Sequence, residues 1–231
     1  MVKESYERVL EQVALACEKC GRAKSSVKLL AVSKFHPFQE MFALYQLGQD
    51  SFGESYVQEA LGKMADFEKE GFSPNFHFIG HLQTRKAPLV AGNFQLIHSL
   101  DSEKLGLALE KALLAQNKTQ DVLLQVNLAL EPQKSGVAQD QLLPLATFVL
   151  EHCPHLKLKG LMCLPPLEAE GEKARPYFVA LRELRDKLAQ SLQLSLPELS
   201  MGMSGDFPFA IYEGATIVRV GTALFGPRPP K

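Results

Sequence analysis

The order of secondary structure that the sequence predicts is the feature that most limits its fold. Short apolar runs typical of buried strands alternate with longer segments whose apolar residues recur at helical spacing. The eight strand candidates are 27–33, 51–53, 76–80, 95–99, 122–127, 158–163, 198–201 and 216–220. Strict alternation implies parallel strands, and eight such units in about 200 residues fit a closed barrel. We therefore predict an α/β fold, a single (β/α)8 TIM-type barrel, with a doubly wound open sheet as the alternative.

One extra helix is predicted before the first strand, over residues 1–21. Its apolar side chains fall on one face, as the helical period requires: Tyr6, Val9, Leu10, Val13 and Cys17. No linker rich in Pro, Gly or Ser divides the 231 residues and no repeat occurs, so we expect one domain over 1–231. We expect the tail 226–231 to be frayed.

Composition and charge argue against several classes of protein. Apolar residues make up 46% and charged residues 22% of the chain, as in globular proteins, and the net charge is −1. Such a chain has no built-in attraction for nucleic acid or anionic membranes. No apolar run approaches the roughly 20 residues that span a bilayer, and the N-terminal residues do not resemble a secretory signal. We expect a cytoplasmic protein that binds neither nucleic acid nor membrane.

The four cysteines are expected to be reduced thiols. Cys17 and Cys20 form a C-x-x-C pair, and His152, Cys153 and His155 lie close together further along the chain. A zinc site would require both groups to converge, whereas the helical pattern already explains the burial of Cys17. We therefore expect no metal site.

Lys34 lies where function collects in such barrels, at the point where a strand ends and its loop begins. It directly follows the apolar run 29–33. Partial burial there lowers the pKa of a lysine ammonium and frees the amine as a nucleophile for an aldehyde. Position alone favours the simpler alternative, a lysine whose stem lies on apolar surface while its charge reaches water.

Small and polar residues follow the last two predicted strands. The two strings are Ser200-Met-Gly-Met-Ser204-Gly205-Asp206 and Arg219-Val-Gly221-Thr222. Backbone N–H groups of such residues bind anions ahead of helix N-termini, and the loops after strands seven and eight commonly hold phosphate in these barrels. Two ordinary glycine turns are the alternative for each string taken alone. Their joint position predicts a site for a phosphorylated ligand, with Lys34 on the opposite side of the mouth.

Other polar residues near predicted strand ends have ordinary explanations. His77 fits a hydrogen-bonded side chain within its strand, and His81 lies nearer the mouth of the barrel. Asn127 and Lys134 lie in a polar loop where capping and solvation explain them. The sequence assigns none of these four residues a role.

Six strings occur in order along nearly the whole chain. They are Ala31-Val-Ser-Lys34, Phe52-Gly-Glu-Ser-Tyr-Val-Gln-Glu59, Phe76-His-Phe-Ile-Gly-His-Leu-Gln-Thr-Arg-Lys86, Gly160-Leu-Met162, Ser200-Met-Gly-Met-Ser-Gly-Asp206 and Val218-Arg-Val-Gly-Thr222. As an ordered set they resemble the YggS/PROSC family, the pyridoxal 5′-phosphate (PLP) homeostasis proteins. The resemblance implies a fold like the N-terminal barrel of alanine racemase.

The same resemblance implies how PLP is held. The cofactor would form a Schiff base with Lys34, and Arg219 would face its pyridine nitrogen. The phosphate would be bound by Ser204, Gly205, Gly221 and Thr222. The chain departs from the family at Ser55, where the family usually has asparagine, so the contact that asparagine would make toward the cofactor is not carried over.

The function implied is intracellular PLP homeostasis, in which the protein holds PLP and hands it on without efficient turnover of amino acids. PLP-dependent apo-enzymes would be the recipients, and we expect a monomer or weak dimer. The alternative is a PLP-dependent amino-acid racemase or decarboxylase of the same barrel type. Those enzymes add a C-terminal β domain with a second acid–base group, whereas only 226–231 follow the last predicted elements. A sugar-phosphate enzyme without PLP would explain the phosphate loops but not the lysine string.

Overall fold

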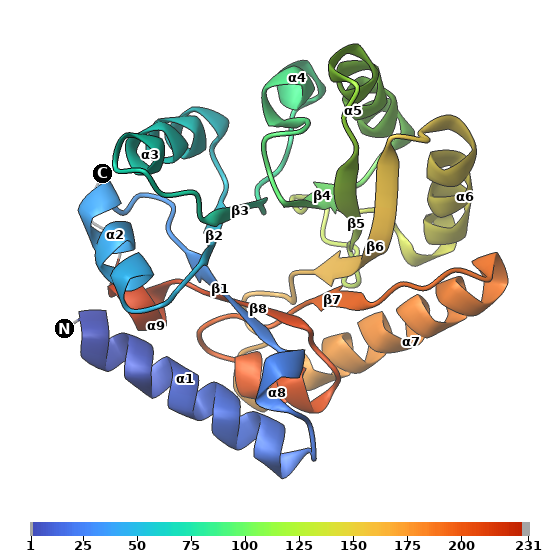
Figure 1. The fold of residues 1–231 in the computed structure, drawn as a ribbon. Helices are drawn as coiled ribbons and strands as arrows, with labels where there is room; N and C mark the ends of the chain where they lie inside the picture. Colours follow the sequence, from blue (N-terminus) through green and yellow to red (C-terminus); the bar gives the residue numbers. More distant parts are fainter. Residues whose placement is uncertain (1, 228–231) are drawn as a thin grey trace.

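Eight parallel strands close into a barrel in the computed structural model, which describes residues 2–227 (Figure 1). The strands are β1 (Lys28–Val32), β2 (Ser51–Glu54), β3 (Asn75–Phe78), β4 (Leu96–Leu100), β5 (Gln120–Val126), β6 (Leu156–Cys163), β7 (Glu198–Ser200) and β8 (Ile217–Val220). Each strand pairs with the next along the chain, and β1 also pairs with β8, which places Leu30 opposite Arg219. The predicted (β/α)8 barrel is confirmed, and the open doubly wound sheet is wrong.

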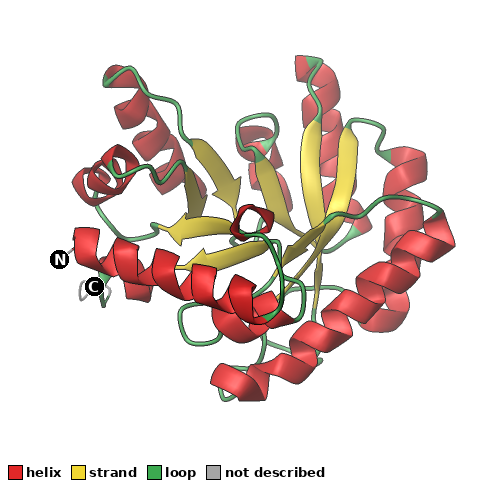
Figure 2. Ribbon diagram, turned by 60° about the horizontal axis from the view of Figure 1, so that its bottom comes forward, coloured by secondary structure: helices red, strands yellow, loops and turns green. Residues whose placement is uncertain are grey.

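Helices follow the strands and surround them, as Figure 2 shows. Before β1 comes α1 (Val2–Lys19), and the remaining helices are α2 (Phe38–Gln46), α3 (Val57–Lys69), α4 (Ala87–Val90), α5 (Glu103–Gln116), α6 (Leu142–His152), α7 (Arg175–Leu192), α8 (Phe207–Tyr212) and α9 (Thr222–Phe225). The carboxyl ends of all eight strands therefore lie at one end of the barrel, where the loops that lead into the helices meet.

Two helices, predicted from the sequence over 103–116 and about 175–192, begin and end at those residues because their ends carry clear signals. Helix α5 starts after Ser102, whose hydroxyl accepts a hydrogen bond from the Leu105 N–H at 3.4 Å. It ends at Asn117, which adopts the left-handed conformation that stops helices. Helix α7 has a proline in its first turn, where the missing N–H costs nothing, and it ends on left-handed Gln193.

Residues 83–90, which the sequence pattern predicts as one helix, are divided in the structure. A 3₁₀ turn at Thr84–Lys86 leads into the single turn of α4, with Pro88 near its start. Proline cannot donate to the preceding turn, so it marks the beginning of a new helix rather than the interior of one. The sequence also gave no separate prediction for α9, which is one turn long. The predicted frayed tail, 226–231, falls largely outside the described residues.

Two apolar clusters stabilise the barrel. The larger one lies between the strands and the surrounding helices, and the smaller one fills the barrel interior. The interior cluster consists of Leu30, Leu96, Leu123, Met162 and Ile217. A filled interior leaves no channel, so a ligand can bind only at the ends of the barrel.

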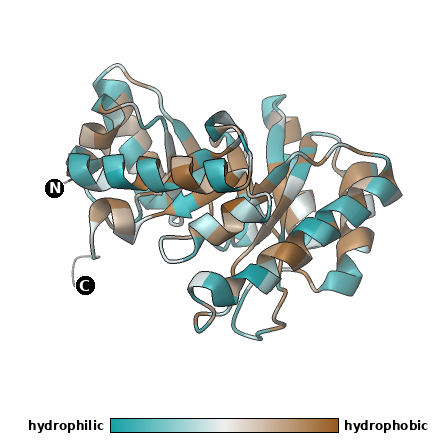
Figure 3. Ribbon diagram, turned by 90° about the horizontal axis from the view of Figure 1, so that it is seen from below, coloured by the Kyte–Doolittle hydropathy of each residue, from teal (hydrophilic) through white to brown (hydrophobic). Residues whose placement is uncertain are grey.

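The predicted N-terminal helix is confirmed as α1, which packs against α8 and α9. Its buried face contains Tyr6, Val9, Val13 and Cys17, while Leu10 is half-buried. The ribbon of α1 carries both hydrophilic and hydrophobic residues (Figure 3), as expected of a helix with one buried face. Within residues 2–227, no helix combines the length and the apolar character needed to cross a membrane.

Candidate functional site

A cavity of about 520 Å³ opens at the carboxyl ends of the strands. Its walls come from the loops after β1, β2, β3, β5, β6 and β7 and from the end of β8. All six residues chosen from the sequence line it, namely Lys34, Ser204, Gly205, Arg219, Gly221 and Thr222, and so does Ser55. Its size is within the range of small-molecule sites.

Lys34 lies two residues beyond β1, in a turn between that strand and α2. It is half-buried, with buried Ser33 before it and half-buried Phe35 after it. Phe35 has a φ of 68°, a left-handed conformation that is unfavourable for a residue with a side chain. The lysine amine is therefore carried by a turn that the neighbouring structure must hold in place.

The two loops after β7 and β8 are joined by Ser204. Its hydroxyl accepts hydrogen bonds from the backbone N–H groups of Gly221 and Ala223, both at 3.3 Å. The first loop is closed by Asp206, whose carboxylate accepts the Met203 N–H at 2.5 Å. The sequence prediction that these loops converge is thus met by direct contact between them.

The same loops offer donors suited to an anion. The backbone N–H groups of Ser204, Gly205 and Thr222 find no acceptor within residues 2–227. Space is open above Gly205, because a Cβ placed there would meet nothing within 4 Å. Unclaimed N–H groups at the edge of a cavity bind phosphate or carboxylate oxygens well.

Arg219 is a buried cation at the cavity wall, only 3% exposed. Its guanidinium donates to Ser200 Oγ at 2.7 Å and to the Cys163 carbonyl at 2.8 Å. Two of its five N–H donors are thus accepted by neutral groups, and no carboxylate within residues 2–227 pairs with it. Burial lowers the pKa of this guanidinium. The remaining donors suit an uncharged or anionic acceptor in the cavity.

A chain of neutral groups lies behind Arg219 in the barrel interior. Ser200 Oγ is 2.8 Å from His98 Nδ1, and His98 Nε2 is 2.9 Å from His77 Nδ1. Burial lowers the pKa of His77 to about 3 and that of His98 well below its usual value, so both rings are neutral at pH 7. Each neutral ring has one N–H, so the direction of one hydrogen bond sets that of the next.

The sequence did not predict most of this row of hydrogen-bonded side chains behind Arg219. It treated His77 as a hydrogen-bonded strand residue, which fits its place in β3, and did not consider His98. The available signal was the position of two histidines within predicted buried strands, where an unpaired polar ring is costly. His77 Nε2 finds no partner within the described part of the chain.

The other polar residues considered from the sequence lie apart or at the rim. His81 is exposed and its ring nitrogen is 2.8 Å from Ser135 Oγ. Among the described residues that line the cavity are neither His81 nor Tyr56, whereas Lys134 does line it. The Lys134 ammonium donates to the Pro165 carbonyl at 2.8 Å and pairs with Glu131. Over residues 2–227, no three His, Cys, Asp or Glu side chains converge as metal ligands would.

Comparison with known proteins gives one consistent result. Residues 9–229 match the family described as the N-terminal domain of alanine racemase. A pyridoxal phosphate homeostasis protein of Aquifex aeolicus is 45% identical over 228 residues, which cover 97% of each chain.

Solved structures show the same similarity. PipY of Synechococcus elongatus, determined with PLP bound, has a TM-score of 0.82 and 36% identity, covering 94% of this chain and 100% of PipY. Alanine racemase of Corynebacterium glutamicum has a TM-score of 0.66 at 18% identity, covering 97% of this chain and 62% of the racemase. The latter likeness concerns the fold alone.

Proposed function

The chain belongs to the family of the alanine racemase N-terminal domain and, within it, to the pyridoxal phosphate homeostasis proteins, and from this premise we propose that it binds PLP. PLP is held as a Schiff base on Lys34 and is handed on to other proteins. The protein serves intracellular PLP homeostasis and does not turn over amino acids efficiently.

The observation that carries this proposal is the set of groups around one cavity. An amine, unclaimed backbone donors and a buried guanidinium line it together. PLP has a matching group for each, an aldehyde, a phosphate and a pyridine nitrogen. These residues therefore fit the cofactor by the chemistry of their donors.

Each residue has a distinct task in this proposal. Lys34 is the covalent anchor, and the unclaimed N–H groups of Ser204, Gly205 and Thr222 bind the phosphate. Gly221 lies beside them and joins the two loops, because its own N–H donates to Ser204 Oγ. Arg219 donates a hydrogen bond toward the ring nitrogen, because a guanidinium has donors only. Bound PLP supplies an aldehyde that reacts with amines and a ring that accepts electrons. A donor at the ring nitrogen keeps it unprotonated and so weakens the ring as an electron acceptor.

The choice between a carrier and an enzyme depends on the acid–base groups at the cavity. The alternative is an amino-acid racemase or decarboxylase, which needs acid–base groups within direct reach of the substrate. Tyr56 and His81 follow β2 and β3 and could each have supplied such a group, but neither is among the described residues that line the cavity. Other titratable side chains do line it, among them Lys134, which donates to the Pro165 carbonyl, and Asp206, which accepts the Met203 N–H. Loss of a general acid or base typically lowers a rate about 10²–10⁴-fold, so a trace activity is compatible with a carrier.

We extend the proposal to partners and location. The recipients are PLP-dependent apo-enzymes, and the chain acts as a monomer or weak dimer. Four unpaired cysteines, three of them buried, support a location in the reducing cytoplasm.

Spectroscopy and transfer assays test this function. The purified protein mixed with PLP should develop a visible absorbance band, and it should then activate an apo-enzyme that depends on PLP. Holo-protein assayed with a panel of amino acids should show no racemisation, decarboxylation or transamination at ordinary rates. Turnover of any amino acid at about 1 s⁻¹ or faster would establish the enzyme instead. Absence of the band would reject PLP binding through an amine.

A further inference from the structure

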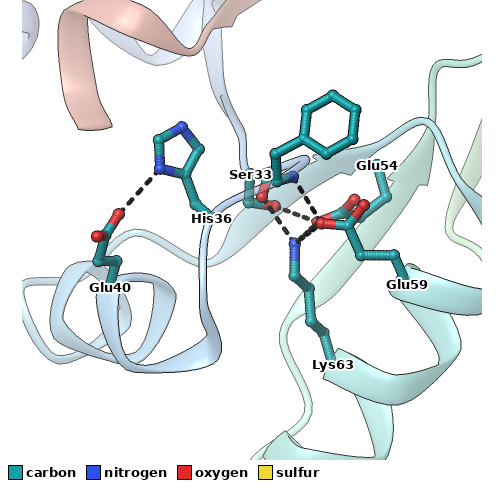
Figure 4. Close-up of polar contacts among 7 residues, drawn as sticks. Ser33, His36, Glu40, Glu54, Glu59 and Lys63 are labelled. Atoms are coloured by element: carbon teal, nitrogen blue, oxygen red, sulfur yellow. Dashed lines mark hydrogen bonds and ion pairs between the residues drawn. The ribbon is translucent and has the colours of Figure 1, made fainter. Parts of the chain in front are cut away.

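A charged cluster outside the cavity holds the turn that carries Lys34. The cluster consists of Glu54 at the end of β2 and of Glu59 and Lys63 on α3, and Figure 4 shows all three converging on the chain at Ser33. We call it the brace. None of its members is among the described residues that line the cavity, whereas all of them contact the residues next to Lys34 or each other.

The brace binds the backbone on both sides of Lys34. On the N-terminal side, the Lys63 ammonium donates to the Ser33 carbonyl at 2.7 Å, and the Ser33 hydroxyl donates to Glu54 Oε1 at 2.7 Å. On the C-terminal side, the Phe35 N–H donates to Glu59 Oε1 at 2.6 Å. The two peptide groups that flank Lys34 are therefore both fixed.

The brace is also internally closed. Lys63 donates to Glu54 Oε1 and to Glu59 Oε1, each at 2.7 Å, so with its bond to Ser33 all three ammonium donors are used. Displacing any one member breaks several charge-assisted hydrogen bonds at once, which makes the geometry specific. This rigidity is what a left-handed residue such as Phe35 requires, because its conformation is unfavourable by itself.

Stability alone does not explain such a group at this place. Glu54 is fully buried and Lys63 is 7% exposed, and well-packed apolar residues often replace buried ion pairs without loss. One lysine faces two carboxylates, and Glu54 Oε2 has no hydrogen-bond partner within the described residues. What the cluster does provide is a fixed peptide group on each side of Lys34.

From these contacts we propose that Glu54, Glu59 and Lys63 are positioning residues that aim the Lys34 amine into the cavity. This inference rests on the proposed function, since the aim of the amine matters for bonding to an aldehyde. A misplacement of about 1 Å is enough to slow a reaction about 10²-fold, so a loosened turn weakens the covalent step. It leaves the phosphate and ring contacts in place, because these come from the loops after β7 and β8 and from Arg219 at the end of β8.

Two ligands separate the covalent step from docking. PLP can bond to Lys34, whereas pyridoxine 5′-phosphate has the same ring and phosphate but an alcohol in place of the aldehyde. Glu59→Ala is the central variant because this side chain is 24% exposed, so its removal leaves a smaller defect than removal of Glu54. Glu59→Gln restores an acceptor for the Phe35 N–H, and exposed Glu68→Ala on the same helix is the matched control.

The effect of Glu59→Ala on binding should depend on which of the two ligands is used. We expect Glu59→Ala to weaken PLP binding and slow its bonding by at least about tenfold, while pyridoxine 5′-phosphate binding stays within about twofold. Glu59→Gln should recover most of the loss, and Glu68→Ala should behave as wild type. Equal loss for both ligands, or no loss for either, overturns the positioning role.

A measurement without cofactor tests the brace separately. Amide hydrogen exchange should accelerate at Phe35 in Glu59→Ala and remain slow in Glu68→Ala, with global unfolding of the two variants alike. If the wild-type protein binds neither ligand, the proposed function fails, and exchange at Phe35 still decides whether the brace holds the turn. Unchanged exchange at Phe35 contradicts the brace itself.

Discussion

The two sides of the cavity fix their key residues in opposite ways. Behind Lys34, the brace of Glu54, Glu59 and Lys63 is charged and lies between β2 and α3. Behind Arg219, the chain through Ser200 to His98 and His77 is neutral and lies inside the barrel. The difference follows from access to water. Glu59 of the brace is partly exposed, so water solvates part of its charge, whereas both histidines are buried and out of contact with water.

The comparison teaches where a barrel can tolerate charge. A buried ion is costly unless it is fully paired, and the brace pairs its lysine with two carboxylates. Within the barrel interior, Arg219 is held by a hydroxyl and a carbonyl only. The interior thus leaves one cation at the cavity wall without a carboxylate beside it, as a site for an electron-rich ligand requires.

Removal of the cation from the brace should have the largest effect on stability. Lys63→Met leaves the buried Glu54 carboxylate without its partner, and we expect a loss of about 3–5 kcal/mol in the free energy of unfolding by urea. Adding Glu54→Gln should recover part of the loss by removing the unpaired charge. Lys69→Met, at an exposed position of the same helix, should change stability little. A loss in Lys63→Met no larger than in this control would refute the charged brace.

Acid should act on the two regions in opposite directions. The pKa values of His77 and His98 lie below that of an unfolded histidine, so the unfolded chain takes up protons first as the pH falls below about 6.5. Their contribution is complete above that pH and is lost toward the pKa of His77, about 3. Burial instead raises the pKa of Glu54, so its protonation favours the folded state as the pH falls.

A variant separates these contributions. Between pH 7 and 5, each buried neutral histidine should account for a loss of about 2 kcal/mol in unfolding free energy. His77→Gln should therefore show a shallower decline than wild type, and Glu54→Gln a steeper one, in urea unfolding at both pH values. Parallel declines in all three proteins would mean that neither region titrates as described.

Loss of one hydrogen-bonding group from the neutral row behind Arg219 should lower the free energy of unfolding by less than loss of Lys63 does. Ser200→Ala removes the group between Arg219 and His98, and we expect a loss of about 1–2 kcal/mol in unfolding free energy. Ser99→Ala is the matched control, because this buried hydroxyl has no partner within the described residues. Its removal should be neutral or slightly stabilising. An equal loss in both variants would show that the chain contributes nothing beyond packing.

The smallest expected effect concerns a single proton, on the pyridine nitrogen of bound PLP. Arg219 remains protonated at any working pH, so against the ring nitrogen of bound PLP it acts as a donor. Nitrogen NMR of labelled PLP on the wild-type protein should therefore report an unprotonated pyridine. A protonated pyridine would place another group, and not Arg219, at that nitrogen.

The barrel could be predicted from the sequence because strands and helix ends are marked by short stretches of neighbouring residues. The alternation of runs gave all eight strands, and the caps of α5 and α7 fixed both helices. Strand β5 was predicted to start two residues late, since its first residue is the polar Gln120. The Gln120 amide is buried and donates to the Phe94 carbonyl at 2.9 Å, a contact between distant segments that no local pattern contains.

The cavity residues were predicted, but their supports were not. Positions at strand ends and the family strings pointed to Lys34 and Arg219, and both line the same cavity. Lys63 lies in a charged helix, where a lysine ordinarily faces water, so nothing in the pattern reveals its burial. Its three partners come from β2, α3 and the turn after β1, and they meet only once the barrel closes.

The central claim, that Lys34 carries PLP, is tested most directly by trapping the bond. Borohydride reduction of the PLP-loaded protein makes the adduct permanent, and mass mapping of a digest then identifies the modified lysine. We expect one adduct, on the peptide that contains Lys34, and none in Lys34→Ala, which should still bind PLP weakly through its phosphate. An adduct on Lys134, which also lines the cavity, or on any other lysine in place of Lys34 would contradict the account.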